Sequence, residues 1–317
     1  MSYKNDLQNN NIDLQGILDM ILALGLVDDP TYPEADTLDG CSWANISAIA
    51  TAGKAQNYFA VGDCKRIVLD GTIGTLELSN YETYVYIIGF DHCGVTNIIT
   101  FGTFKNALSD STDICLVNDY SAYKTDGAKI FNMNHWGNYN HGGWKGCDLR
   151  YDILGSTNVA PSGYGSAVTT SRVGYDATST CATNPVANTL MAALPFELRT
   201  VMKPMTVYTD NVGNSSTTAS NVTASIDYLP LLAEFEIFDD IVSSNQYEQI
   251  YLQQYPYFSA GNSKVKYQHS STSSTAIWWE RSPYCLNDTN FCRVNTNGES
   301  TNSYLRLSYG LAPIFRV

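Results

Sequence analysis

The last forty residues decide the fold of this chain: Trp278-Trp279-Glu280-Arg281-Ser282-Pro283, then YCLNDTNFCRVNTNGESTNSYLRLSY from Tyr284 to Tyr309, then Gly310-Leu311-Ala312-Pro313-Ile314-Phe315-Arg316-Val317. Two apolar blocks bracket a segment rich in Asn, Ser, Thr and Tyr. Tyr offers a large contact area with few rotatable bonds, and Ser and Asn supply adaptable hydrogen bonds. This pattern is typical of a recognition loop held on a rigid scaffold. An ordinary surface loop has the same composition, and composition alone favours that alternative.

The blocks WWERSP, FCRVNTNG and SYGLAPIFRV resemble the C-terminus of C-type-lectin-fold proteins that retroelements diversify in phages and gut bacteria. Further blocks resemble an uncharacterised domain family of such phages. These blocks are Trp43–Gly53, Asn57–Asp63, Tyr86–Asp91, Gly142–Arg150, Leu190–Pro204 and Leu229–Phe238. The resemblance extends from about residue 40 to Val317 and names no ligand.

The resemblance implies an α+β fold, in which a C-type-lectin-like domain has a short twisted sheet, two or more helices and long loops. An N-terminal helix precedes this domain. The expected division is 1–38 for the helix and linker and 39–317 for the lectin-like domain. Within the domain, the polar positions of the segment 284–304 are expected to vary between copies, while the flanks stay as framework.

The resemblance also implies which side chains bind the ligand. They are Tyr284, Leu286, Asn287, Asp288, Asn290, Phe291, Arg293, Asn295, Asn297, Ser300, Asn302 and Tyr304. Aromatic and Arg side chains dominate the energetics of interfaces, so four residues are expected to contribute most: Tyr284, Phe291, Arg293 and Tyr304. Since a strand alternates its faces, Phe291 or Leu286 is expected to pack inward first.

The residue types of the segment agree with diversification at adenines. Changing the first two bases of an AAC codon cannot yield Lys, Gln, Glu, Met or Trp. Between Tyr284 and Tyr309 these types occur once, as Glu299. Directly upstream they are frequent: Lys264, Lys266, Gln268, Trp278, Trp279 and Glu280.

Composition and charge restrict the partners. The 317 residues are 44% hydrophobic and 12% aromatic, which predicts a globular core, but only 15% are charged. That balance is typical of β-rich extracellular or virion proteins. A net charge of -13 excludes nucleic-acid binding and disfavours anionic membranes. Since neither a signal peptide nor a membrane span is visible, we expect a phage tail protein, made in the bacterial cytoplasm and carried in the virion.

Residues 4–26 predict a helix with an apolar seam. The seam positions are Leu7, Asn10, Leu14, Ile17, Ile21 and Leu24. A coiled coil at a terminus, before the linker Asp28–Asp39, indicates a homo-oligomer, and the resemblance favours a trimer. The alternative is a helix docked on its own domain. Either way the helix needs a partner, because a helix of this length is marginal alone in water.

The remaining pattern predicts short elements. A helix is expected over Trp43–Ala55, with Asp39 or Ser42 as its cap, and a helix-like segment over Leu190–Val201, where Pro195 restricts the interior. Asn211–Thr223 predicts a polar loop. Strands are expected at Arg66–Leu69, Gly74–Leu78, Val85–Phe90, Ile98–Phe101, Ile226–Phe238, Ile277–Trp279 and Leu311–Val317.

Candidate metal ligands are few. Asp91-His92-Cys93 and the pair His135 and His141 invite a transition-metal hypothesis, but their spacing matches no zinc motif. The two later histidines are better explained by a Gly/Asn-rich loop that positions Trp136 and Trp144. Asn287-Asp288 and Asn295–Asn302 could supply oxygens to calcium if they converge. We therefore expect no cofactor and no metal.

Catalytic patterns are equally weak. Glu234 with Glu236, or Asp239-Asp240, could form a glycosidase pair, but the first two are better explained by one polar face of a half-buried strand. Formylglycine-generating enzymes share the lectin-type fold, so Cys285 and Cys292 deserve comparison with a reactive pair. Diversification would destroy catalytic residues there. Most of the eight cysteines are expected to be free and buried.

The sequence therefore favours a non-enzymatic protein that binds a host-surface protein or carbohydrate. Two alternatives stay open. One is a structural virion protein without a diversified site, and the other is an enzyme of the formylglycine-generating type.

Overall fold

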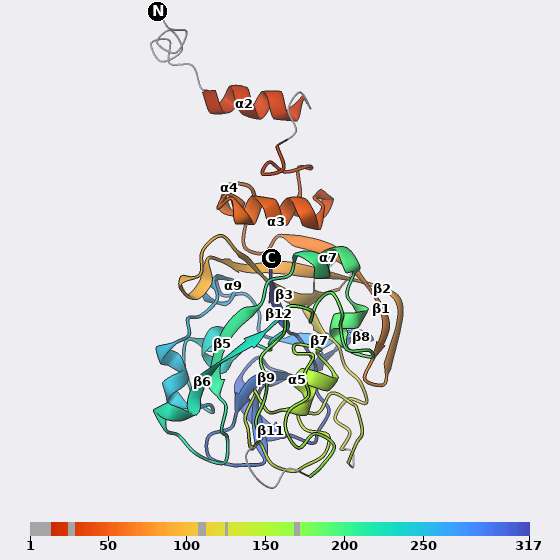
Figure 1. Cartoon of the computed structure of the whole chain (residues 1–317), viewed down its shortest axis with the longest axis vertical. Helices are drawn as coiled ribbons and strands as arrows, with labels where there is room; N and C mark the ends of the chain where they lie inside the picture. Colours follow the sequence, from red (N-terminus) through yellow and green to blue (C-terminus); the bar gives the residue numbers. More distant parts are fainter. Residues whose placement is uncertain (1–13, 25–28, 107–111, 124–125, 168–171) are drawn as a thin grey trace, which may run out of the picture.

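The computed structural model describes residues 14–24, 29–106, 112–123, 126–167 and 172–317 (Figure 1). These residues form a mixed α+β fold of several small sheets and short helices. The helices are α2 (Leu14–Ala23), α3 (Trp43–Thr51), α4 (Ala55–Tyr58), α5 (Asp148–Asp152), α6 (Leu190–Ala193), α7 (Phe196–Val201), α8 (Glu234–Phe238) and α9 (Pro256–Ser259). Short 3₁₀ turns are η1 (Leu38–Gly40), η2 (His92–Gly94), η3 (Ala219–Asn221) and η4 (Gln246–Ile250).

Four groups of strands carry the fold. The largest sheet has the order β1-β2-β3-β12, and the others are β11-β10-β9, β4-β7-β8 and β5-β6. The strands are β1 (Cys64–Ile73), β2 (Leu76–Phe90), β3 (Ile99–Lys105), β4 (Ile114–Cys115), β5 (Met205–Asp210), β6 (Val222–Asp227), β7 (Lys266–Gln268), β8 (Ser271–Ala276), β9 (Trp278–Pro283), β10 (Asn290–Val294), β11 (Ser300–Tyr304) and β12 (Ile314–Arg316).

The four-stranded sheet combines β1 to β3, from residues 64–105, with β12, from residues 314–316. β12 pairs antiparallel with β3, so that Phe315 lies opposite Phe101 and their rings stack at 5.1 Å. Helix α3 covers them, because Trp43 contacts the same two rings edge-on. The predicted helix at Trp43–Ala55 is confirmed as α3 followed by α4. Ser42 is its cap, since its side chain accepts a hydrogen bond from the Asn45 amide.

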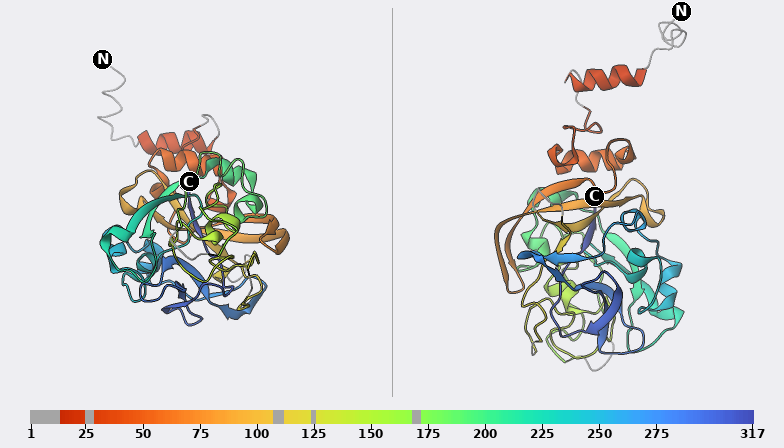
Figure 2. Two further views of the ribbon diagram at one scale, coloured as in Figure 1. Left: turned by 60° about the horizontal axis from the view of Figure 1, so that its bottom comes forward. Right: turned by 180° about the vertical axis from the view of Figure 1, so that it is seen from behind.

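Helix α2 lies at one end of the molecule, beyond α3, and β11 lies at the other (Figures 1 and 2). The predicted helix over 4–26 is confirmed for Leu14–Ala23, and the seam positions Leu7 and Asn10 fall outside the described residues. The apolar side chains of Ile17, Leu18, Met20 and Leu24 are exposed. Since a helix this short gains its stability from packing, this apolar face calls for a partner.

The tryptophans of β9 are both buried. Trp278 donates its indole N–H to the carbonyl of Lys264 at 3.0 Å, and Trp279 donates to that of Phe131 at 2.8 Å. Gly310 lies beside Trp278 in a parallel bridge. A side chain at Gly310 would collide with the sulfur of Cys115, so glycine lets the closing segment pack directly on β4.

The predicted strand at Ile226–Phe238 is wrong. Strand β6 ends at Asp227, and after Pro230 the chain enters helix α8. Pro cannot donate to a sheet ladder. The helix begins where the Glu236 carboxylate accepts a hydrogen bond from the Ala233 amide at 2.9 Å. Glu234 and Glu236 are both buried on a helix, so they do not form the polar face of a half-buried strand.

The other predicted elements hold with shifted ends. Pro195 divides Leu190–Val201 into α6 and α7. The predicted loop Asn211–Thr223 ends at Asn221, because Val222 and Thr223 belong to β6. The strands expected between Arg66 and Phe101 lie in β1, β2 and β3. The expected strand Ile277–Trp279 overlaps only the start of β9, and Leu311–Val317 contains β12. No helix within the described ranges combines the length and apolar character that crossing a membrane requires.

Replacing either tryptophan of β9 should destabilise the fold. Trp278→Ala and Trp279→Ala each remove a fully buried side chain and leave a cavity, which typically costs about 3–5 kcal/mol. Thermal or urea unfolding monitored by circular dichroism measures the loss. Leu286→Ala, at a side chain that is 71% exposed, is the matched control and should change the midpoint little. Unchanged midpoints for both Trp variants would contradict the framework role of β9.

Candidate ligand-binding site

The structure brings the twelve expected ligand-binding residues into one region, at the end of the molecule opposite α2 (Figure 1). This region, residues 284–304, is called the hairpin surface below. It consists of the connection from β9 to β10, the antiparallel pair β10 and β11, and their turn. β10 is the central strand and β11 is the edge of the sheet, so one side of β11 carries no strand partner within the sheet.

The twelve expected ligand-binding residues differ in solvent exposure. Leu286, Asn287 and Asn297 are exposed. The half-buried members are Tyr284, Asp288, Asn290, Arg293, Asn295, Ser300, Asn302 and Tyr304. Phe291 is fully buried, so it cannot contact a ligand and belongs to the core. It packs inward as expected, whereas Leu286 is 71% exposed. All five residues of β11 are half-buried, while all six of β9 are buried.

Arg293 organises the polar groups on one face of the hairpin surface. Its guanidinium donates to the Asn302 carbonyl at 3.2 Å, to the Ser303 hydroxyl at 2.5 Å and to the Asn295 side chain at 3.1 Å. It also lies over the ring of Tyr309 at 5.6 Å. No carboxylate of the described residues forms an ion pair with it. A half-buried guanidinium held by neutral acceptors keeps its positive charge available to a ligand.

Aromatic side chains from a distant loop extend this surface. Tyr304 stacks on Tyr123 at 5.8 Å, and Tyr123 is 54% exposed. Tyr139 stacks on His141 at 5.0 Å, and the imidazole of His141 lies 3.8 Å from the carboxylate of Asp288. No pattern in the sequence predicted that the exposed Tyr123 and Tyr139 and the buried His141 lie beside the segment 284–304. Tyr139 and His141 lie in a Gly/Asn-rich segment, which indicates a loop, but no local pattern indicates that this loop lies beside β11.

Asn140 fixes the two loops that meet there. Its buried side-chain amide donates to the carbonyls of Asn287 and Asn290 at 3.0 and 2.9 Å. Its side-chain oxygen accepts from the amide of Asn214 at 2.9 Å. One side chain therefore satisfies main-chain groups of the hairpin surface and of the loop after β5.

The buried carboxylates of Glu234 and Glu236 form hydrogen bonds in the core beside the hairpin surface. Glu234 accepts hydrogen bonds from the amides of Val242, Ser243 and Ser244 and from the hydroxyl of Ser300 on β11. Glu236 forms a two-point ion pair with Arg281, with N–O distances of 2.6 and 3.0 Å. Both carboxylates are therefore occupied in structural bonds, which argues against a glycosidase pair.

Two further carboxyl groups lie on or beside β9. Glu248 accepts from the Asp210 amide at 2.9 Å and lies 2.6 Å from the Ser282 hydroxyl. Burial raises its pKa from the ordinary 4.5 to about 8. Both carboxyl oxygens of Glu280 lack a hydrogen-bond partner among the described residues, and burial, with Glu234 and Glu248 nearby, raises its pKa well above the ordinary range. The raised pKa values favour the protonated form of both groups.

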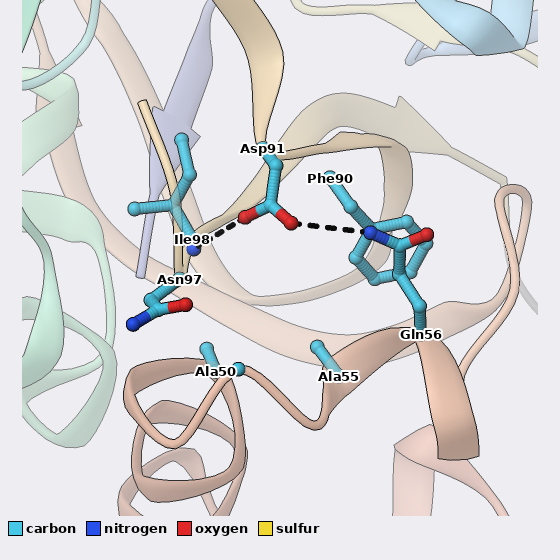
Figure 3. A pocket seen from close by; sticks show the side chains of 8 residues that line it. Ala50, Ala55, Gln56, Phe90, Asp91, Asn97 and Ile98 are labelled. Carbon is cyan, nitrogen blue, oxygen red and sulfur yellow. Dashed lines mark hydrogen bonds between the residues drawn. The ribbon is translucent and has the colours of Figure 1, made fainter. Parts of the chain in front are cut away.

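The Asp91-His92-Cys93 run does not converge on a metal. The Asp91 carboxylate accepts from Gln56 at 3.1 Å and from the Ile98 amide at 3.3 Å, beside a hollow of about 10 Å³ that has room for roughly one water molecule (Figure 3). His92 instead stacks on Tyr255 at 3.7 Å. Across the described residues, no three His, Cys, Asp or Glu side chains gather in a way that could hold a metal ion.

His135 is a core residue of the Gly/Asn-rich loop. Its ring nitrogen Nδ1 lies 2.8 Å from the Asn132 side-chain oxygen, and burial lowers its pKa to about 3. Of the two tryptophans in this loop, Trp144 is fully buried and Trp136 is half-buried. The expected role of the loop in positioning them agrees with this burial.

The cysteines of the hairpin surface are not activated. All eight cysteines lie within the described residues and are free. Burial raises the pKa of both the Cys285 and the Cys292 thiol, and Cys292 is fully buried. A reactive cysteine needs a lowered thiol pKa and access to substrate. These two thiols have raised pKa values, which does not favour a catalytic pair.

The raised pKa of Glu248 makes stability depend on pH. Between about pH 4.5 and 8 the unfolded state releases this proton and the folded state keeps it, so stability falls as pH rises. Glu248→Gln mimics the protonated group and removes that loss. Relative to wild type, the variant should gain up to about 1.4 kcal/mol per pH unit across this window.

Urea unfolding at several pH values measures this difference. Glu299→Gln, at an exposed position of the β10–β11 turn, controls for the loss of one charge. Parallel pH profiles for wild type and Glu248→Gln would mean that Glu248 is ionised in the folded protein.

Comparison with known proteins places the chain in a family. Residues 112–317 match the family described as Domain of unknown function (DUF6273). A search of curated proteins and a search of solved structures find no match to the chain. The matched residues include α5 to α9, β4 to β12 and the whole hairpin surface. Since the match spans more than half of the sequence, the chain belongs to the DUF6273 family.

Proposed function

We propose that this protein is a non-enzymatic recognition protein of a phage tail, which binds a protein or carbohydrate on the host surface through residues 284–304. The observation that carries the proposal is the contrast between β9 and β11. All six residues of β9 are buried, while the five small or aromatic residues of β11 are each half-buried on an edge strand. A fixed framework therefore lies directly beside a surface of adaptable polar groups.

The proposed scaffold is C-type-lectin-like, of the kind that retroelements diversify. Two features support it. β12, at the end of the sequence, pairs in one sheet with β1 to β3. The stretch between β4 and β5, residues 116–204, contains only short helices among its described residues. A small sheet beneath long irregular loops is the arrangement that the resemblance implies.

Diversification requires that side chains change without loss of the fold. Asn140, which lies outside the hairpin surface, bonds to its main chain at Asn287 and Asn290, so these bonds do not depend on the side chains that vary. The bond of Glu234 to the Ser300 side chain would be lost where residue 300 varies to a residue without a hydrogen-bond donor. The exposed members Asn287 and Asn297 make hydrogen bonds within their own turns. Surface substitutions of this kind usually change stability by less than about 0.5 kcal/mol.

Substitutions on the hairpin surface should weaken binding and spare the fold. Tyr304→Ala combined with Asn297→Ala removes one aromatic and one polar contact. We expect apparent affinity to fall by about 30-fold, the equivalent of the ~2 kcal/mol that a hot spot contributes. Binding is measured on a glycan array and on intact bacterial cells, with periodate or protease pretreatment to distinguish a carbohydrate from a protein ligand.

Phe196→Ala is the control for that experiment. Phe196 is 60% exposed on α7, far from β11 (Figure 1). Binding that survives the hairpin variants and disappears with Phe196→Ala would place recognition elsewhere. Natural copies of the gene provide a second check, since their differences should concentrate at adenines in the codons of residues 284–304. Differences spread evenly over β9 and β12 would contradict diversification.

Self-association of α2 is expected to present several hairpin surfaces together. Ile17, Ile21 and Leu24 lie on the predicted seam, and two of them are exposed. The wild-type protein should form a trimer, whereas a variant lacking residues 1–38 should be a monomer in light scattering at micromolar concentration. Replacing the three seam residues by Gln keeps the chain length and should also give monomers. Equal, monomeric masses for all three proteins would refute the coiled coil.

A further inference from the structure

A second cavity lies apart from the hairpin surface. Its volume is about 220 Å³, and it is bounded by η2, β5, α8 and β12 together with the segment that connects η4 to α9. Among the described residues that line it, none belongs to 284–304. A cavity of this volume has room for a small organic molecule and not only for single waters.

The cavity contains a buried cation without a counterion. Arg316 is 5% exposed, and its guanidinium makes two long hydrogen bonds, to the Thr100 hydroxyl and the His92 carbonyl, both at 3.4 Å. No carboxylate of the described residues lies within ion-pair distance of it. Its Nη1 group makes no hydrogen bond with these residues. An uncompensated buried charge is costly, so this side chain favours an anion beside it.

The one carboxylate in the cavity wall is already neutralised. Glu236 lines the cavity, but its two oxygens face the guanidinium of Arg281 at 2.6 and 3.0 Å. Arg281 also uses its remaining N–H groups on Thr209, Leu231 and Tyr208. The Glu236–Arg281 pair therefore contributes little net charge, and Arg316 sets the sign of the cavity.

His92 adds a polar group beside Arg316. It is buried and its ring stacks on Tyr255, while its Nε2 atom has no hydrogen-bond partner among the described residues. Burial lowers the pKa of His92, so the ring is neutral at pH 7, and its hydrogen bond to the backbone of Gln253 uses the one N–H that a neutral ring carries. Asp91 and Cys93 hold the turn in the left-handed conformation, with φ of 48° and 54°, which fixes the position of His92 between them.

Two aromatic rings also line the cavity. Tyr208 and Tyr251 stack at 4.3 Å with an angle of 7° between their planes, and both line the cavity. Tyr251 is 44% exposed, so it stands at the cavity mouth. A flat or short apolar group fits such a wall, while an anionic group reaches the inner end.

We propose that this cavity is a binding site for a small organic carboxylate, whose carboxylate group contacts Arg316 and whose carbon skeleton lies against Tyr208 and Tyr251. A guanidinium recognises a planar carboxylate through two parallel hydrogen bonds, which a halide or a neutral polar molecule cannot form. The site requires neither the hairpin surface nor its ligand.

Small carboxylates should stabilise the protein and shield Cys93, whose thiol lines the cavity. The probes are acetate, benzoate and glucuronate, with glucose as the neutral counterpart of glucuronate and chloride as the salt control. Thermal unfolding should show a saturable rise in midpoint with at least one carboxylate. Alkylation by iodoacetamide, followed peptide by peptide in mass spectrometry, should slow at Cys93 by about fivefold or more at saturation. Cys64, half-buried outside this cavity, is the internal control and should react at an unchanged rate.

Substitutions locate the effect. Arg316→Gln and Tyr251→Ala should each weaken carboxylate binding by about tenfold or more, while Lys203→Gln, which also removes one positive charge but points to Thr51, should leave it unchanged. If Arg316→Gln fails to fold, Tyr251→Ala and the protection of Cys93 still decide the question. Absence of stabilisation by every carboxylate would overturn the proposal. So would stabilisation that persists in Tyr251→Ala without protection of Cys93, because the anion would then bind elsewhere.

Discussion

The buried guanidinium of Arg281 is the interaction on which the C-terminal part of this protein depends. All five of its N–H donors are used: two reach Glu236 on α8, and the others reach the Thr209 hydroxyl and the carbonyls of Tyr208 and Leu231. One side chain on β9 thereby holds β5, α8 and the segment between β6 and α8. Burial works against the charge, but Glu236 outweighs it and raises the pKa of Arg281. An ion pair of this kind tolerates removal of neither partner.

This arrangement shows how one sheet can contribute both to the core and to the proposed binding surface. β9 is anchored by the hydrogen bonds of Arg281 and by the contact of Trp279 with Tyr309. β10 is hydrogen-bonded to β9 and inserts Phe291 into the core. β11 is held by its hydrogen bonds with β10 and by the contact of Ser300 with Glu234. Stability therefore decreases outward, from the buried strand to the edge. The proposed ligand-binding side chains lie where few framework bonds depend on them.

Ser300, Arg281 and the cavity of Arg316 are linked through α8. Glu234, the first residue of this helix, accepts a hydrogen bond from Ser300 of the hairpin surface. Glu236, two residues later, forms the ion pair with Arg281 and lines the cavity. Any movement of α8 would therefore displace side chains at both proposed sites. The short helix is itself held firmly, because Glu234 accepts from the three consecutive amides that follow it at 242–244. The two sites share a rigid support and differ in charge and shape.

Local pattern alone predicted the elements whose signals are local. The helix at Trp43, the strands β1 to β3, the division at Pro195 and the closing strand follow from periodicity, capping and the geometry of proline. The sequence also predicted that residues 284–304 form one polar segment between apolar flanks. It failed at Ile226–Phe238, because an apolar run that contains Pro230 and two Glu residues has the same composition whether it pairs in a sheet or turns into a helix around buried ion pairs.

Only the tertiary structure decided which charges are buried and which side chains share a surface. Tyr123 and His141 join Tyr304 and Asp288 across more than a hundred residues, and Arg316 meets His92 across more than two hundred. Such neighbours are set by the packing of sheets and loops, because hydrogen bonds and burial act between groups that the chain brings together from any distance along it. The composition of the proposed binding segment is therefore determined by the sequence, whereas the shape and charge of both proposed sites exist only in the folded molecule.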